Sequence, residues 1–184
     1  MFEQIMIEQC SPTMAGLKTG NLFTCPYENK CELNCNIRKL NMLAVPKGVR
    51  IVPLKFSKER ALIYMYRPEK LKADLSDSEA ESILKDMDYP IKNAEECIVK
   101  LVHRLEDENS FPHEIGLFLG YPPEDVSGFI EKGARGAKCV GNWCVFGDEK
   151  KALEKFALYK KCTSLYKKAY CKFNSIDRLI VSGT

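Results

Sequence analysis

The feature that most constrains the fold is a pair of β-rich runs that lie close together in the sequence. VRIVPLKF, residues 49–56, and ALIYMY, residues 61–66, are separated only by the polar SKER at 57–60. Two such runs with a four-residue polar link predict an antiparallel hairpin. Pro53 has no N–H to give to a sheet ladder, so we expect the first strand at a sheet edge or bulged there. The second run is apolar on both faces, which predicts the more central strand.

Helical patterns surround this hairpin. Apolar residues recur at helical spacing over 28–43, Ser76 and Glu79 have the spacing of a capping box near Asp77, and Asn93 is an expected N-cap. Residues 2–9 predict a short helix before a loop or broken element at 11–20, and NLFTC at 21–25 predicts a strand. Asp148 is expected to cap a long C-terminal helix over 149–173. We therefore predict an α+β fold: a small, mainly antiparallel sheet around the hairpin, covered by helices.

Composition indicates an ordinary globular chain. Of the 184 residues, 45% are hydrophobic and 29% charged, and the formal net charge is +3. This charge is too small to imply nucleic acid by itself. No apolar run approaches the roughly 20 residues needed to cross a bilayer, and the first ten residues carry acids where a signal peptide needs bases. We expect a cytoplasmic protein with no membrane association. Without a repeat or a low-complexity linker, we predict a single domain over residues 1–184.

Nine cysteines are many for such a chain, and the number is odd. Without an export signal, a disulfide framework is not expected. Cys25, Cys31 and Cys35 follow a Cys-x5-Cys-x3-Cys spacing, and Cys139 and Cys144 a Cys-x4-Cys spacing. Neither matches the paired Cys-x2-Cys of structural zinc sites. We predict free thiols and no bound metal, with an iron–sulfur or zinc site at 25/31/35 and redox use of one thiol as the alternatives.

The segment FPHEIGLFLGY, residues 111–121, invites two interpretations. Adjacent His113 and Glu114 could be catalytic, but a metalloprotease motif needs a second histidine four residues after the first, and position 117 is leucine. The other interpretation is architectural: Pro112 begins a short buried helix, Gly120 ends it, and the prolines that follow begin a second helix. We predict the architectural role and keep His113 as the first titratable candidate, because histidine carries protons near neutral pH.

Three further features are candidates for binding. AGLKTGN, residues 15–21, combines glycines with Lys18 and Thr19, and could contact an anion through its backbone, although it lacks the order of a P-loop. Trp143, the only tryptophan, is either a core anchor or a ligand platform. The C-terminal helix is rich in lysine and tyrosine, which suggests RNA; the two residue types lie on opposite faces, which favours a packed amphipathic helix instead. Its outward lysines are Lys150, Lys161, Lys168 and Lys172.

Several segments together resemble an uncharacterised bacterial family, number 3793 in the series of domains of unknown function. They are CSPTMAGLKTGNLF, PKGVRI, ALIYMYRP, FPHEIGLFLGYPPEDVSGFI, CVGNWCVFGD and FALYKKCTSLY, and the resemblance runs from about residue 2 to 180. It implies a single-domain protein, typically from anaerobic bacteria, without an established activity. It also draws attention to Lys18, His113, Glu114, Gly116, Gly120, Tyr121 and Cys139. One departure follows Trp143: the family pattern has a lysine where this chain has Cys144.

These observations leave three hypotheses for function. The first is a small-ligand or partner-binding protein without catalysis, whose site would gather Lys18, Thr19, His113, Glu114, Tyr121, Cys139 and Trp143. The second is an enzyme that uses His113 as acid–base or Cys139 as thiol nucleophile. The third is an RNA-binding module on the C-terminal helix, which the distribution of its lysines does not favour. The sequence indicates no particular cofactor, ligand or protein partner.

Overall fold

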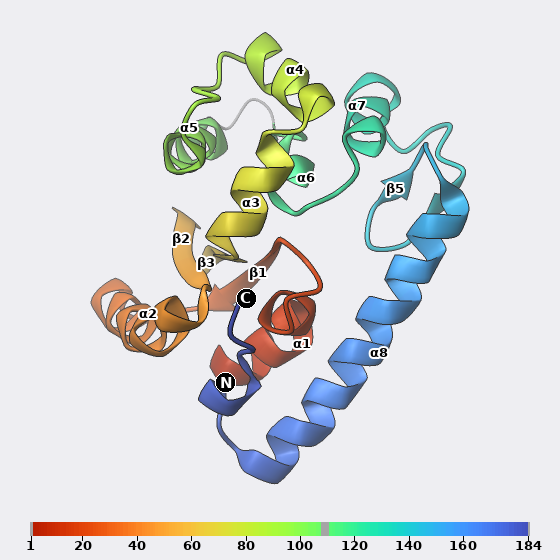
Figure 1. Ribbon diagram of the computed structural model, residues 1–184. Coiled ribbons are helices and arrows are strands. Elements are labelled where there is room, and N and C mark those ends of the chain that lie inside the picture. Colours follow the sequence, from red (N-terminus) through yellow and green to blue (C-terminus); the bar gives the residue numbers. More distant parts are fainter. Residues whose placement is uncertain (1, 108–110, 184) are drawn as a thin grey trace. The chain divides into compact units, whose positions relative to one another are not determined.

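Figure 1 shows the computed structural model, which describes residues 2–107 and 111–183. The chain divides into two compact units. Unit 1 comprises Met1–Glu69 and Lys161–Thr184, and unit 2 comprises Lys70–Lys160. The borders between the units fall inside two helices, α3 (Pro68–Leu75) and α8 (Glu149–Phe173). The predicted α+β class is confirmed, while the prediction of a single domain remains a prediction.

The sheet of unit 1 is built around the predicted hairpin. Its strands are β1 (Gly20–Pro26), β2 (Arg50–Phe56) and β3 (Arg60–Tyr66), in the order β1-β3-β2, and both pairs are antiparallel. The central place of β3 is confirmed. The expectation for Pro53 is also confirmed: β2 is an edge strand, and its register with β3 shifts between Pro53 and Lys55. A proline without an N–H is tolerated where a bulge interrupts the ladder.

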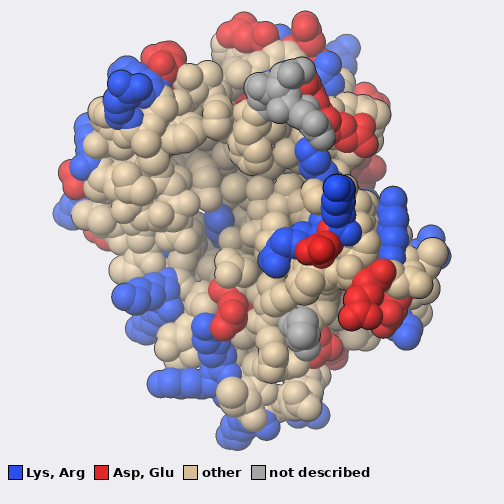
Figure 2. All heavy atoms as spheres, turned by 180° about the vertical axis from the view of Figure 1, so that it is seen from behind, with Lys and Arg blue, Asp and Glu red and all other residues tan. Residues whose placement is uncertain are grey.

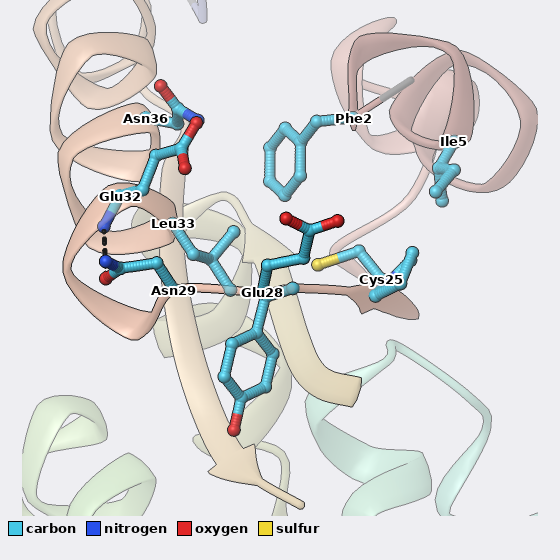
Figure 3. A pocket seen from close by; sticks show the side chains of 10 residues that line it. Phe2, Ile5, Cys25, Glu28, Asn29, Glu32, Leu33 and Asn36 are labelled. Atoms are coloured by element: carbon cyan, nitrogen blue, oxygen red, sulfur yellow. Dashed lines mark hydrogen bonds between the residues drawn. The ribbon is translucent and has the colours of Figure 1, made fainter. Parts of the chain in front are cut away.

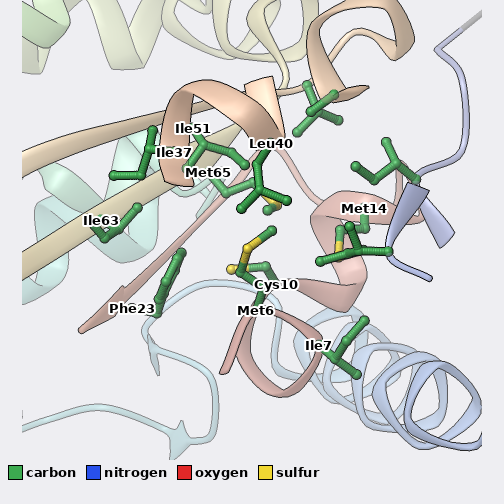
Figure 4. Close-up of a cluster of buried hydrophobic side chains, with 14 of the residues drawn as sticks. Met6, Ile7, Cys10, Met14, Phe23, Ile37, Leu40, Ile51, Ile63 and Met65 are labelled. Carbon is green, nitrogen blue, oxygen red and sulfur yellow. The ribbon is translucent and has the colours of Figure 1, made fainter. Parts of the chain in front are cut away.

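One face of this sheet is covered by helices. Successive side chains of a strand point to opposite faces, and Ala61, Ile63 and Met65 of β3 enter the main core. There they meet α1 (Phe2–Met14) and α2 (Lys30–Ala44), as Figure 4 shows for the buried side chains of both helices. The apolar stripe predicted for α2 is confirmed as buried; it consists of Leu33, Ile37, Leu40 and Ala44.

Helix α1 is longer than predicted. The chain stays helical through Pro12 to Met14, although proline removes a helical hydrogen bond and costs about 3 kcal/mol in a helix interior. Tertiary burial explains the difference, because Met6, Ile7 and Met14 are all buried, and each such side chain contributes roughly 1.5–3 kcal/mol. The loop or broken element predicted from residue 11 therefore begins only after Met14.

The edge of the sheet at β2 is partly covered by one side chain. Asn41 of α2 donates from Nδ2 to the carbonyl oxygen of Ile51 at 2.7 Å and accepts from the Ile51 N–H at 2.9 Å. The amide thereby satisfies backbone groups that an edge strand leaves without a strand partner. This pair of bonds fixes α2 to the strand that it covers.

Arg67, directly after β3, connects the end of α1 with the C-terminal segment of the chain. Its guanidinium donates to the carbonyl oxygens of Thr13 at 2.7 Å, Met14 at 2.8 Å and Val181 at 2.7 Å. Val181 also donates its own N–H to the Met14 carbonyl at 3.0 Å. The end of α1 and the C-terminal segment, which includes the 3-10 helix η2 (Asp177–Leu179), are therefore fastened to the end of β3.

Unit 2 is largely helical. Besides parts of α3 and α8, it contains α4 (Ser78–Asp86), α5 (Ala94–Glu106), α6 (Ile115–Phe118), α7 (Pro123–Lys132) and a small hairpin of β4 (Cys139–Val140) and β5 (Cys144–Val145). The predicted N-cap Asn93 and the predicted start of α4 are confirmed. The capping side chain of α4 is Asp77 and not Ser76, whose hydroxyl donates to the Lys72 carbonyl instead.

The long C-terminal helix spans the predicted residues 149–173. Asp148 accepts a hydrogen bond from the N–H of Lys151 at 3.0 Å, as expected of an N-cap. Among the described residues, none of the helices is both long enough and apolar enough to cross a membrane.

Candidate functional site

The segment 111–121 forms the tight corner that its sequence predicts. Helix α6 is a single turn, and Gly120 ends it with a φ of +72°, a conformation that favours glycine. The N–H of Tyr121 then bonds back to the Gly116 carbonyl at 3.0 Å. Pro123 begins α7 directly afterwards. The corner therefore places Tyr121 and the side chains of α7 beside the start of α6.

Within this corner, His113 and Glu114 have different surroundings. Glu114 is buried; it accepts from the Tyr89 hydroxyl at 2.8 Å and makes an ion pair with Arg104 of α5. Burial and the Glu114 charge raise the pKa of Tyr89, so this hydroxyl remains a donor. His113 is exposed and contacts the rings of Phe111 and Phe129. The two side chains do not form a dyad.

Asp125 connects α7 to the small hairpin. It is buried, and its carboxylate accepts three hydrogen bonds: from Trp143 Nε1 at 2.6 Å, from the Phe146 N–H at 2.7 Å and from the Gly147 N–H at 2.8 Å. A buried carboxylate needs such donors because an unpaired charge is costly away from water. The hydrogen bonds of this carboxylate thus hold the indole of Trp143 and the end of the hairpin in place.

A pocket of about 350 Å³ lies between this corner and the hairpin; we call it the aromatic pocket. Five of its thirteen lining residues carry rings, and His113 is one of these five. The lining residues are Phe111, His113, Ile115, Gly116, Tyr121, Asp125, Val126, Phe129, Val140, Gly141, Asn142, Trp143 and Cys144. Sites for small molecules are typically concave, mostly apolar and equipped with a few polar groups, and this pocket has that composition.

Ring stacking shapes one wall of the aromatic pocket. Tyr121 and Trp143 stack with centroids 4.8 Å apart, and Phe156 of α8 meets the edge of Trp143 at 4.5 Å. The Tyr121 hydroxyl donates to the Asn142 carbonyl at 3.1 Å. Burial raises the pKa of Tyr121 to about 12, so the phenol stays protonated near neutral pH. The rings of this wall are therefore uncharged near neutral pH.

Two glycines permit this close packing. A Cβ on Gly116 would lie 2.8 Å from a methyl carbon of Val126, and one on Gly141 would lie 2.3 Å from the Phe156 ring. Such distances require a neighbour to move. The pocket thus depends on both glycines, and Gly116 is one of the residues that the family resemblance singles out.

Cys139, the thiol predicted as a site residue in this region, lies outside the lining of the aromatic pocket. Desolvation and the nearby Glu149 carboxylate raise the pKa of its thiol, which disfavours the nucleophilic thiolate. Cys144, in contrast, lines the pocket. The position at which the sequence resemblance implies a departure from the family, Cys144, therefore lies in the candidate site.

Lys18 and Thr19 belong to unit 1, whereas the other predicted site residues belong to unit 2. Both side chains are buried. Burial lowers the pKa of Lys18 to about 8, against a small opposing effect of Cys10. The structure thus brings together His113, Tyr121 and Trp143 in one pocket, while Glu114 and Cys139 lie nearby in the same unit but do not line it.

The outward lysines of α8 are exposed as predicted, including Lys150, Lys161, Lys168 and Lys172. Figure 2 shows the basic side chains of one face dispersed among uncharged ones. Exposed lysines on one side of a long helix are typical of a solvated helix face, and they give no added support to RNA binding. Within residues 2–107 and 111–183, no three His, Cys, Asp or Glu side chains gather where they could hold a metal ion.

Unit 1 contains a second pocket, of about 370 Å³. Figure 3 shows Phe2 and Ile5 of α1 and Glu32, Leu33 and Asn36 of α2 around it. Its two carboxylates, Glu28 and Glu32, are exposed to solvent. Because water solvates these two charges, they would add little to the free energy of binding a ligand. The aromatic pocket of unit 2 is therefore the better candidate site.

A family comparison agrees with the resemblance seen in the sequence. The model of the family described as Protein of unknown function (DUF3793) matches residues 6–180. The chain belongs to this family. No curated protein and no solved structure matches the chain. The family match covers both units and every residue of the aromatic pocket.

Sequence reasoning missed two contributors to this site. In the sequence, Asp125 has the features of an ordinary acid in the first turn of α7, where its charge suits the helix dipole. Phe129 of the same helix contributes its ring to the pocket lining. Neither role has a local signal in the sequence, since both depend on where the hairpin 139–145 packs.

Proposed function

We propose that the protein binds a small, uncharged, ring-bearing molecule in the aromatic pocket, without catalysing its conversion. One observation carries this proposal: the pocket is lined by several aromatic rings, and the hydrogen-bonding capacity of its single carboxylate is used by the protein itself. Asp125 accepts three hydrogen bonds from the protein, so it offers a ligand little further attraction. Affinity would come from stacking and from apolar burial.

The alternative is an enzyme that uses His113 or Cys139. An acid–base histidine usually has a partner that orients it. Among the described residues, the imidazole of His113 makes ring contacts and no hydrogen bond or ion pair. The raised pKa of Cys139 likewise opposes a thiolate nucleophile. Binding without catalysis therefore has the better support, and the cytoplasm remains the expected compartment.

The proposal can be tested with quinoline, an uncharged fused-ring probe, and 2-naphthoate, an anion of similar size. We expect saturation-transfer NMR to detect quinoline on the wild-type protein, and the fluorescence of Trp143, the only tryptophan, to change as it binds. Val140 lines the pocket and is 70% exposed, so Val140→Glu should leave the fold intact. It should weaken binding about tenfold, or about 1.4 kcal/mol, because it places a charge at the mouth.

Val99→Glu is the matched control. Val99 lies on α5 in the same unit, is 56% exposed and does not line the pocket. Quinoline should bind this variant as it binds the wild type. Absence of quinoline binding, or equal weakening in both variants, would contradict the proposal. Binding of 2-naphthoate as strong as that of quinoline would contradict the uncharged class of ligand.

A further inference from the structure

Helix α2 carries a thiol pair on its outer face, which the aromatic pocket does not use. Of the nine cysteines, three are exposed: Cys31, Cys35 and Cys171. Cys31 and Cys35 are four residues apart on α2, and thus lie one above the other on the same face. The core-facing stripe from Leu33 to Ala44 lies on the opposite side of the helix. Both thiols are therefore directed away from the core.

We propose that Cys31 and Cys35 form a two-thiolate site for a soft monovalent cation such as Cu⁺. Thiolate sulfur selects soft ions of this kind. Binding replaces the two thiol protons with one ion, so each Cu⁺ bound releases two protons and leaves a complex of net charge −1. Arg38 and Lys39 follow Cys35 by three and four residues, at the spacing where helix side chains are neighbours. Their positive charges offset that of the complex and that of Glu32, which precedes Cys35 by three residues on the same helix.

Geometry distinguishes this site from a disulfide. Residues four apart on a helix have Cβ atoms about 5–6 Å apart. A disulfide needs a Cβ separation of about 3.5–4.5 Å, so closing one would distort the first turns of α2. With metal–sulfur bonds of the length known for zinc, about 2.3 Å, a linear sulfur–metal–sulfur bridge spans roughly 4.6 Å, which is close to the separation of the two Cβ atoms.

The helix is also well formed where the thiols lie. Asn29 caps α2, and its side-chain oxygen accepts from the Cys31 N–H at 2.8 Å and from the Glu32 N–H at 3.3 Å. Binding therefore needs little ordering of the backbone. Cys25, the third cysteine of this region, is 1% exposed and belongs to the core of unit 1. With two thiols and no third ligand among the described residues, the site suits a two-coordinate ion and not tetrahedral zinc.

Anaerobic titration of the reduced full chain with Cu⁺, in competition with bathocuproine disulfonate, tests the proposal. We expect the wild type to retain about one ion per chain against the chelator, because two sulfurs bind the same ion. Cys31→Ser and Cys35→Ser should each abolish this retention. Cys171→Ser, which removes an exposed but isolated thiol, should leave it unchanged.

A displaced thiol provides the sharpest control. The double variant Cys35→Ser/Asn36→Cys keeps the number of thiols but turns the second one about 140° around the helix from Cys31. Asn36 is exposed, so the core face of α2 is untouched. This variant should lose the retained ion while its circular dichroism stays that of the wild type. Retention of the ion by this variant, loss of it in Cys171→Ser, or no retention by the wild type would each overturn the proposal.

Discussion

Asp125 is the residue on which the candidate site depends most. A single carboxylate satisfies the indole N–H of Trp143 and two backbone N–H groups of the hairpin, and all three bonds are at or below 2.8 Å. Hydrogen bonds to a charged group are stronger than neutral ones, and a buried donor left without its acceptor carries the full cost of desolvation. The wall of the aromatic pocket is therefore maintained by a residue that does not need to contact the ligand.

Replacing Asp125 with alanine should lower the free energy of unfolding by about 3 kcal/mol or more, because three donors lose their acceptor. Urea denaturation followed by Trp143 fluorescence measures the loss, and the native emission should shift to the red as the indole loosens. Glu131→Ala, which removes an exposed acid from the same helix, should change stability little. Equal stability of Asp125→Ala and wild type would contradict this structural role.

Lys18 is a second residue whose burial has a measurable consequence. Its folded-state pKa is lowered from 10.5 to about 8, so below pH 8 folding buries a charge at a cost of about 3 kcal/mol. Between pH 8 and 10.5 the unfolded chain binds more protons at this group than the folded chain does. The contribution of Lys18 to stability therefore becomes less unfavourable as pH rises through this window.

We expect Lys18→Met to be more stable than the wild type near pH 7. The difference should shrink steadily between pH 8 and about 10.5, because the wild-type lysine loses its charge in both states. Buried thiols with raised pKa values, such as Cys162, act in the opposite direction, but those that do not interact with Lys18 are common to both proteins and cancel in the difference. Denaturation curves at several pH values measure it, and a difference independent of pH would show that Lys18 titrates normally.

At the scale of elements, the corner between α6 and α7 positions the side chains that line the aromatic pocket. One helical turn, a glycine with positive φ and two prolines reverse the chain within a few residues. The turn buries Ile115, Leu117 and Phe118, while the same segment exposes His113. The architectural interpretation of FPHEIGLFLGY is supported for these apolar residues, and a role for His113 in binding remains a prediction.

Two substitutions separate the architectural from the functional residues of this corner. Gly120→Ala should cost about 1 kcal/mol or more, because alanine is strained at a φ of +72°. His113→Ala should cost less, since the side chain is exposed, and should instead weaken binding of quinoline. Thermal melts of both variants compare the two costs. A larger destabilisation by His113→Ala would identify His113 as a structural residue.

At the scale of the whole molecule, the two units are joined in an unusual way. Domain boundaries normally fall in exposed, flexible linkers. Here both borders fall inside helices, between Glu69 and Lys70 in α3 and between Lys160 and Lys161 in α8. A helix is cooperative along its length, so melting one unit would fray the helices that it shares with the other.

We therefore expect the chain to unfold in a single transition, as the prediction of one domain requires. Differential scanning calorimetry should give equal calorimetric and van't Hoff enthalpies. Two resolved transitions, or denaturation monitored at Trp143 of unit 2 that precedes loss of helical circular dichroism, would instead show that the units unfold separately.

Local patterns determined most elements of this protein. The hairpin with its bulge at Pro53, the caps Asp148 and Asn93 and the buried stripe of α2 depend on residues close together in the chain, so the sequence alone predicted them. The class of fold and the length of α8 followed in the same way. Backbone geometry and the periodicity of burial act locally, and the amino-acid sequence displays both directly.

Only the tertiary structure decided which of the candidate residues meet. Pro12 stays within a helix because distant side chains bury Met14, and Asp125 becomes a hydrogen-bond hub because the hairpin 139–145 folds back onto α7. The same packing joins His113, Tyr121 and Trp143 in one pocket and turns Glu114 towards Arg104 and Tyr89. These outcomes depend on contacts between residues that are far apart in the sequence. The free energies of such contacts exceed local conformational preferences, and no single segment of the sequence indicates them.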